Sequence, residues 1–218
     1  MQRSHYSGPL LTPVVHWFDK PREAPPHCRS SGNDACAAIC SPLLSELASI
    51  HESAHAVAAY VLHKPIHSVA IAGGNCSGGE FRGHPPPGRP IDDAAALKAI
   101  VSGLEPSVAA RSLWRDNLIA LAAGRAAQRR YGATHAVYDA MCGSDFEKIE
   151  RVARAVTTSS TEAAEYVAEI VAEAARLIDA HWPQIERMAR ALRAAGRLDE
   201  ATISATIRAR PSRSPIRR

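Results

Sequence analysis

Apolar residues recur every three or four positions through the segment 41–64, SPLLSELASIHESAHAVAAYVLHK. This spacing places them on one stripe of an α-helix. The stripe consists of Leu43, Leu47, Ile50, Ala54, Val57 and Val61. Ser41 suits the N-cap, Pro42 suits the first helical position, and Pro65 stands just beyond the end. The pattern therefore predicts one amphipathic helix over 41–64.

A change of period follows this helix. Val69 and Ile71 alternate with small residues, which is typical of a short, half-buried strand. The segment 80–82, which follows two glycines, is the expected hairpin partner of that strand. The next residues, 83–90, read GHPPPGRP and form a loop by composition. We expect a small β-hairpin here.

From Ile91 the pattern is helical almost to the end of the chain. Capping residues, prolines and glycines divide it into helices over 92–104, 107–130, 144–156, 161–180, 183–195 and 199–207. Gly132 fits the C-terminal glycine of the second of these, and Ser144 with Glu147 forms a capping box that opens the third. The segment 117–127 is small and apolar on most sides, so we expect it to be closely buried.

Composition agrees with a mostly helical protein. Hydrophobic residues make up 46% of the 218 residues, but Ala dominates them and aromatic residues reach only 5%, which favours packed helices over a sheet sandwich. Residues 1–40 are rich in proline and are expected to be an irregular arm. Residues 208–218 hold five Arg and no acid, and without them the chain has 21 basic and 22 acidic residues. We therefore expect one domain over 41–207, a disordered Arg-rich tail over 208–218, and no nucleic-acid binding by the near-neutral domain.

Five cysteines at irregular spacing do not describe a disulfide framework. Cys28, Cys36 and Cys40 lack C-x-x-C spacing and are not expected to form a zinc site. Apolar runs are too short for a membrane span, and the N-terminus shows no signal-peptide pattern. These features favour a location in the reducing cytoplasm.

The candidate chemistry lies on the first predicted helix. His51, Glu52 and His55 form an H-E-x-x-H motif. Two His side chains one helical turn apart, roughly 40° around the axis, can bind one Zn²⁺. Glu52 projects from the flank of the same face, where it can act as general base toward a metal-activated water. A surface helix that carries these residues by chance is the alternative interpretation.

The motif leaves the third metal ligand open. Downstream candidates are Glu80, Glu105, Asp139, Cys142, Asp145 and Glu147. Asp145 stands in the first turn of the predicted helix 144–156, where the macrodipole favours an ionised carboxylate. The same position would also explain Asp145 as a residue that only stabilises the helix start. The sequence pattern alone does not decide between these two roles.

Several segments together resemble the peptidase domain of the FtsH-type ATP-dependent zinc metalloprotease family. The segment 51–71, HESAHAVAAYVLHKPIHSVAI, is similar to that family's zinc-site helix and following strand. LAAGRAAQRRYG, 121–132, resembles its buried Gly-Arg-Ala-Ala helix, and GSDFEKIERVARA, 143–155, the helix that brings the third zinc ligand. The likeness covers roughly residues 45–207. It implies a mostly α, zincin-like peptidase domain with a small β-hairpin, and it implies Asp145 as the third ligand.

This chain departs from the family at several points. It contains no Walker A motif, so the family's motor is not carried over. Ala54 replaces a usual Gly, Gln128 and Arg129 replace a usual acidic pair, and Ser144 stands where Asn is usual.

The resemblance implies a zinc metalloendopeptidase in which His51, His55 and Asp145 hold the metal and Glu52 is the general base. Substrates would be peptides or unfolded proteins, aligned by edge pairing with the strand around Val69. A separate ATPase, which would deliver larger substrates, and a homo-oligomer are the expected protein partners. The alternative is a zinc-stabilised regulatory or binding module that does not turn over substrate. The intact Glu52 argues against that alternative, because a structural zinc site does not need it.

Overall fold

The computed structural model describes residues 34–71, 79–82, 106–133 and 135–209. Side chains of 34–44, 79–82, 109, 113 and 135–144 lie outside this description, as does the helix expected over 92–104. The described elements, in chain order, are α2 (Asp34–Val61), β1 (Ser68–Ile71), β2 (Gly79–Arg82), α4 (Val108–Tyr131), α5 (His135–Val156), α6 (Ser160–Ala180), α7 (Trp182–Ala195), β3 (Arg197–Asp199) and α8 (Glu200–Arg208). The protein is therefore mostly helical, as the sequence predicts.

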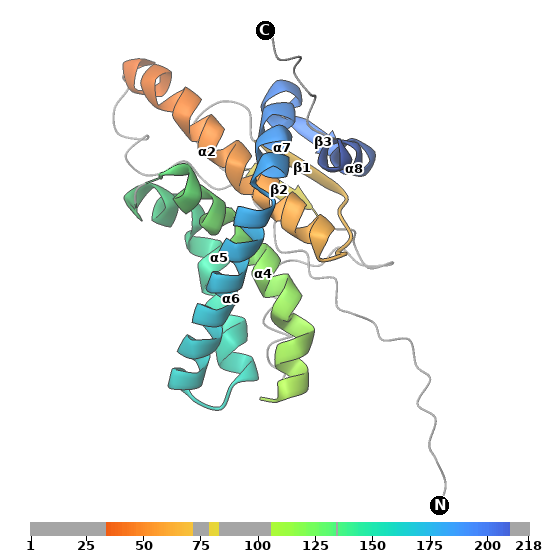
Figure 1. Cartoon of the computed structure of the whole chain (residues 1–218). Coiled ribbons are helices and arrows are strands. Elements are labelled where there is room, and N and C mark those ends of the chain that lie inside the picture. Colours follow the sequence, from red (N-terminus) through yellow and green to blue (C-terminus); the bar gives the residue numbers. More distant parts are fainter. Residues whose placement is uncertain (1–33, 72–78, 83–105, 134, 210–218) are drawn as a thin grey trace, which may run out of the picture.

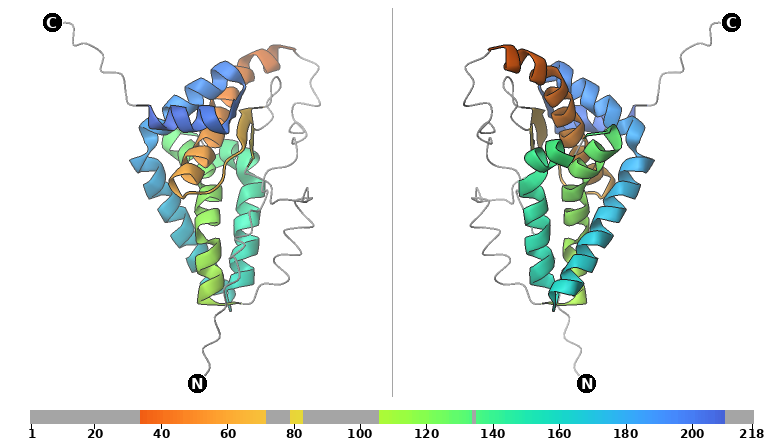
Figure 2. Two further views of the ribbon diagram at one scale, coloured as in Figure 1. Left: turned by 90° about the vertical axis from the view of Figure 1, so that its right-hand side faces the viewer. Right: turned by 90° about the vertical axis from the view of Figure 1, so that its left-hand side faces the viewer.

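The helices form two layers that meet at α4. In one layer α4, α5 and α6 run side by side, and in the other α2 packs with α7, α8 and the sheet (Figures 1 and 2). Each layer has its own group of buried side chains, one around Val57 and Met188, the other around Trp114 and Leu118. Because α4 and α6 each supply residues to both groups, these two helices join the layers.

Local sequence signals explain most helix ends. Ser107 caps α4 by accepting a hydrogen bond from the backbone N–H of Ala110, and Gly132 closes it in the left-handed conformation, with φ of 95°. Ser159 caps α6 and Asp199 caps α8, each by accepting a bond from a backbone N–H of the first turn. These caps confirm the predicted helices 107–130, 161–180 and 199–207 to within a few residues.

Two predicted helix starts are wrong. The first helix begins at Asp34 and runs through Pro42, so Ser41 is not its cap, and residues 34–40 are helical rather than part of an irregular arm. The Ala-rich sequence DACAAIC favours helix, and the helix continues through Pro42 although an interior proline removes one backbone hydrogen bond and crowds the preceding turn. Likewise α5 is continuous from His135, so Ser144 does not open a helix.

The sheet is antiparallel and three-stranded, in the order β2-β1-β3. Val69 of β1 pairs with Phe81 of β2 and with Leu198 of β3. The hairpin expected from the sequence is present, but β3 was not predicted. Because β1 is paired on both sides, the prediction that it aligns a substrate by edge pairing is wrong; the sheet edges in the described part are β2 and β3.

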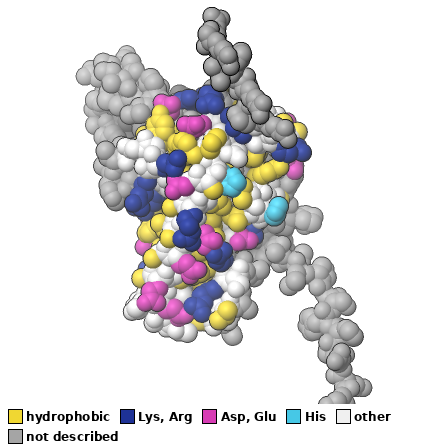
Figure 3. All heavy atoms as spheres, in the orientation of Figure 1, with side chains coloured by type: hydrophobic (Ala, Val, Ile, Leu, Met, Phe, Trp, Pro, Cys, Tyr) yellow, Lys and Arg dark blue, Asp and Glu magenta, His cyan; other side chains and the backbone are white. Residues whose placement is uncertain are grey.

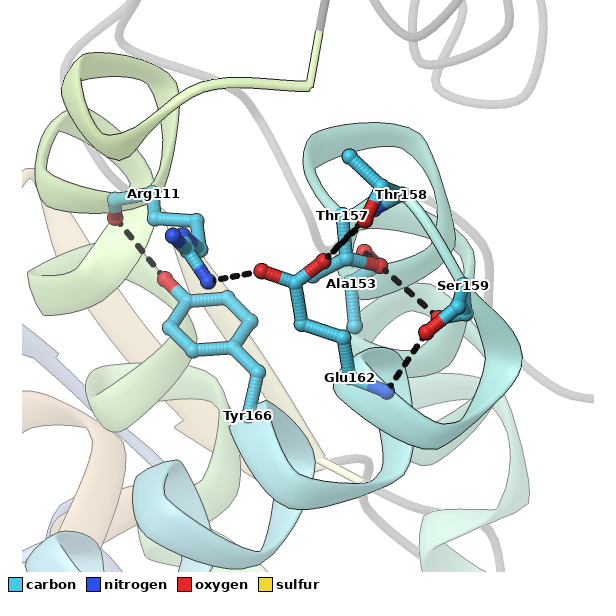
Figure 4. A network of polar contacts seen from close by, with 7 residues as sticks. All are labelled: Arg111, Ala153, Thr157, Thr158, Ser159, Glu162 and Tyr166. Carbon is cyan, nitrogen blue, oxygen red and sulfur yellow. Dashed lines mark hydrogen bonds and ion pairs between the residues drawn. The ribbon is translucent and has the colours of Figure 1, made fainter.

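A polar network lies near the start of α4 and the start of α6 (Figure 4). The Tyr166 hydroxyl donates to the Arg111 carbonyl at 2.8 Å, and Arg111 forms an ion pair with Glu162. Glu162 also accepts from the backbone N–H of Thr158 at 2.7 Å. The network therefore joins α4, α6 and the turn that follows α5, which limits how α5 can slide along α4.

Charged side chains of both signs are interspersed on the described face shown in Figure 3, and no extended area of one sign is visible there. Within the described residues, no helix is both long and apolar enough to span a lipid bilayer.

Candidate metal centre

The motif helix α2 brings two imidazoles into the interior, facing α4. His51 is 5% exposed and His55 is 1% exposed. Their Nε2 atoms lie 2.9 Å apart. The stripe that the sequence predicts is buried as expected at Leu47, Ile50 and Ala54, so packing of α2 fixes the direction in which the two rings point.

The backbone of α4 determines the tautomer of His55. The Nδ1 atom of His55 lies 2.8 Å from the Ala120 carbonyl oxygen. A carbonyl only accepts, so Nδ1 carries the proton, and in the neutral ring Nε2 keeps its lone pair. A carbonyl behind the ring in this way is the usual support of a metal-binding His.

A glycine of α4 makes room for both rings. A Cβ atom at Gly124 would lie 2.4 Å from Cε1 of His51 and 2.6 Å from Nε2 of His55, well inside van der Waals contact. Gly124 therefore allows α4 to approach α2 at this level. The sequence contained a signal for this role, since a glycine inside an Ala-rich buried helix costs about 1 kcal/mol and marks close approach.

Asp145 of α5 completes the cluster. Its Oδ2 atom lies 3.3 Å from Nε2 of His51 and 3.6 Å from Nε2 of His55. Its other oxygen, Oδ1, lies 4.0 Å from Nζ of Lys148, a partner that the sequence analysis did not identify. Among the described residues these three, His51, His55 and Asp145, form the group whose donor atoms converge for a metal ion, all within 4.8 Å of one another.

The reason for which the sequence favoured Asp145 is wrong, although the residue does lie in the cluster. Asp145 is in the interior of α5, not in a first turn, so the helix dipole does not place it there. It lies instead on the buried stripe of α5 with Ile149, Val152 and Val156, and is only 8% exposed. An acid at an apolar position of a helical stripe is the signal that identifies such a residue.

Charge interactions keep Asp145 ionised. Burial raises the pKa of its carboxyl, but the hydrogen bonds and charges of His51 and His55 outweigh burial and hold the pKa well below its usual range. A buried carboxylate beside two imidazoles is a charge-neutralising donor set for a divalent cation.

The distances fit a tetrahedral ion. Ligand bonds of about 2.0–2.1 Å in tetrahedral geometry separate neighbouring donor atoms by about 3.4 Å. The three separations here, 2.9, 3.3 and 3.6 Å, bracket that value. A tetrahedral ion held by these two nitrogens and one carboxylate oxygen would accept one further ligand.

The structure describes the side chains of some of the remaining predicted site residues but not of others. Glu52 is 4% exposed and lies in α2 beside His51, inside the protein rather than on its surface. Glu147 is exposed and does not join the cluster. Glu105, and the side chains of Glu80, Asp139 and Cys142, lie outside the described part of the chain.

Comparison with known proteins does not assign this chain to a family. A scan against protein-family models and a search of curated proteins both find no match to this chain. The fold and site together therefore define a mostly helical protein with a buried His-His-Asp cluster that can hold a metal ion, and the likeness to FtsH-type peptidases rests on the sequence motifs.

Proposed function

We propose that this protein is a zinc-dependent metallopeptidase with a zincin-like domain. The observation that carries the proposal is that His51 and His55 meet Asp145, which lies 90 positions after His55 in the chain. The two histidines belong to an H-E-x-x-H motif, in which the acid, Glu52, directly follows His51. An acid at the second motif position has no role in holding a metal, whereas peptide hydrolysis needs a general base there.

In this proposal His51, His55 and Asp145 hold zinc. Zinc bound there would act as a Lewis acid, which would polarise the scissile carbonyl and lower the pKa of water. The Glu52 carboxylate takes a proton from the attacking water as the new C–O bond forms. It then gives that proton to the amide nitrogen as the C–N bond breaks. Burial of Glu52 keeps other water from competing for its proton.

The burial of the cluster limits the substrate. With its donor residues no more than 8% exposed, the cluster is reached by an extended or unfolded chain rather than by a folded surface. Peptides and unfolded proteins are therefore the proposed substrates, and a separate ATPase would be needed to present a folded one.

Metal analysis is the first test. We expect about one zinc per chain in purified protein, lost when His51 and His55 are both changed to Ala. Circular dichroism checks that the double variant remains helical. Full zinc occupancy in the folded double variant would refute this site.

The second test separates chemistry from metal binding. Glu52→Gln should keep zinc and fold but slow hydrolysis of unfolded casein by at least about 100-fold, the usual contribution of a general base. Glu147→Gln, which changes an exposed acid of α5 in the same way, is the matched control and should remain active. Equal activity of the Glu52→Gln variant would remove Glu52 from the mechanism.

A non-catalytic, zinc-stabilised module is the competing function. The low exposure of the donor residues favours it, because structural zinc sites are closed. It predicts that zinc stabilises the fold while neither wild type nor any variant cleaves peptides. A zinc-loaded wild type without hydrolysis of casein or of a mixed peptide library would favour this module.

A further inference from the structure

A cavity of about 620 Å³ lies between α4, α5 and α6 and begins at Asp145. It is hollow because its walls carry small side chains, among them Ala122 and Ala126 of α4 and Ala168 and Ala175 of α6. Its volume is in the range of sites that hold a ligand or a few residues of a peptide. Because Ala168 and Ala175 are exposed, the cavity is open to solvent along α6.

The cavity and the metal centre share a wall. Asp145 belongs to both, and the next residue, Phe146, lines the cavity beside it. The guanidinium of Arg125 lies 4.6 Å from the centre of the Phe146 ring, which gives this part of the wall an apolar face with a cation above it. A chain whose peptide bond lies at the cluster therefore has the cavity within reach on one side.

The cations of the cavity are not equivalent. Arg130 forms an ion pair with Asp179, and its guanidinium lies 4.8 Å from the centre of the Trp182 ring. Arg129 also lines the cavity and is exposed, and within the described residues no acid pairs with it. Arg129 is thus the cation of this wall that remains available to a carboxylate of a ligand.

We propose that the α4–α6 cavity binds the substrate residues beside the cleaved bond, and that Arg129 selects a substrate with an acidic residue there. This inference rests on the proposed peptidase function. Gly124 is the residue of α4 at which an added Cβ would meet both motif imidazoles. Arg129 follows it by five residues, or about 7.5 Å along α4. An extended peptide covers that distance in two to three residues. The preferred substrate has an apolar side chain against the alanine walls and a carboxylate two or three residues from the cut.

The experiment uses fluorescent peptides that share one apolar sequence and differ only in Asp or Asn, placed two or three residues to either side of the cut. Binding is measured by anisotropy with zinc-loaded full-length Glu52→Gln protein, in which cleavage does not interfere. We expect one Asp position to bind about 5- to 10-fold tighter than its Asn counterpart, as for a charge-assisted contact that is partly exposed. Arg129→Ala should remove this preference, while Arg151→Ala, an exposed arginine of α5 outside the cavity, should keep it.

Two further measurements complete the test. Ala168→Phe places a large side chain in the cavity wall and should weaken the binding of both the Asp and the Asn peptide, while zinc content stays at the wild-type level. In the active protein the Asp preference should appear in KM, with kcat changed less than 2-fold.

The outcomes are distinguishable from those of the proposed function. A preference for Asp that depends on Arg129, in a protein that hydrolyses nothing, supports the cavity and refutes the peptidase. Hydrolysis without that preference, or a preference that survives Arg129→Ala, overturns the cavity assignment. Binding of dodecanoate to the cavity with no binding of either peptide overturns it in favour of an anionic amphiphile.

Discussion

Replacing Gly124 with Ala tests the geometry of the metal centre directly. The added Cβ would lie 2.4 Å from Cε1 of His51 and 2.6 Å from Nε2 of His55. Ordinary contact begins at 3.4 Å, so the rings or the whole of α4 must move by about 1 Å. The rings cannot turn away easily, because His55 is 1% exposed and is held at 2.8 Å by the Ala120 carbonyl.

Two effects of opposite sign act in this variant. Alanine favours the helix over glycine by about 1 kcal/mol, whereas overpacking a buried contact costs about 1–3 kcal/mol. The net change in the free energy of unfolding without metal should therefore be small, between about zero and 2 kcal/mol of destabilisation. Metal affinity should change far more, because a binding site tolerates ligand displacements of only about 0.2 Å. We expect zinc affinity to fall by at least about 10- to 100-fold.

Competition with a fluorescent chelator measures the affinity, and urea unfolding in EDTA measures the stability of the metal-free protein. Gly132→Ala is the matched control, because Gly132 has φ of 95° with nothing within 4 Å of an added Cβ. It should lose about 1 kcal/mol of stability through backbone strain while its zinc affinity stays unchanged. A Gly124→Ala protein that binds zinc as tightly as wild type would refute the argument from the close approach of α4.

Three further predictions concern the same framework. Asp145→Asn should weaken zinc binding by more than about 10-fold in chelator competition, with helix content by circular dichroism unchanged. The control Glu147→Gln, which changes an exposed acid two residues away, should leave both zinc affinity and helix content unchanged. Wild-type zinc affinity in Asp145→Asn would exclude that carboxylate as a ligand. Burial raises the pKa of Tyr166 to about 12, so the folded state retains that proton better than the unfolded chain, whose tyrosines titrate near 10. The contribution of Tyr166 to the free energy of unfolding should thus be fully present below pH 10 and decrease between pH 10 and 12 in urea titrations. Tyr166→Phe should remove this part of the pH dependence; an identical profile in that variant would show another group to be responsible. Excess zinc should raise Tm relative to EDTA for wild type but not for His51→Ala, and equal shifts in both would place the stabilising ion elsewhere.

Local signals in the sequence were sufficient where a helix end faces solvent. Gly132 and Asp199 each cap the helix that they were expected to cap, because a capping bond needs only neighbouring backbone. The capping box at Ser144 had the same appearance but is not a helix start, because α5 already begins at His135, N-terminal to Ser144, and packs against α4. A cap contributes only about 1 kcal/mol, so a capping pattern alone does not determine where a helix begins.

Pairing over long distances was not predictable from the sequence. Strand β3 has three residues with one buried apolar side chain, Leu198, which is too short for a periodic pattern. Its partner in β1, Val69, lies 129 positions earlier. In the candidate site, the spacing of His51 and His55 follows from one helix and was predictable, whereas the contributions of Gly124 and Lys148 depend on how α4 and α5 pack. The catalytic role of Glu52 stays a prediction.

The location of the cluster at the meeting of two helical layers gives a bound ion a mechanical role besides any chemical one. An ion that joins His55 to Asp145 closes a loop of 90 residues, and a disulfide that closed a loop of that length would restrict the unfolded chain by about 4–5 kcal/mol. The ion is a reversible cross-link, so chelation would open it without breaking a covalent bond. The layer of α2, α7 and the sheet would then be held to α5 through α4 and α6, and the stability of the fold would depend in part on the supply of metal.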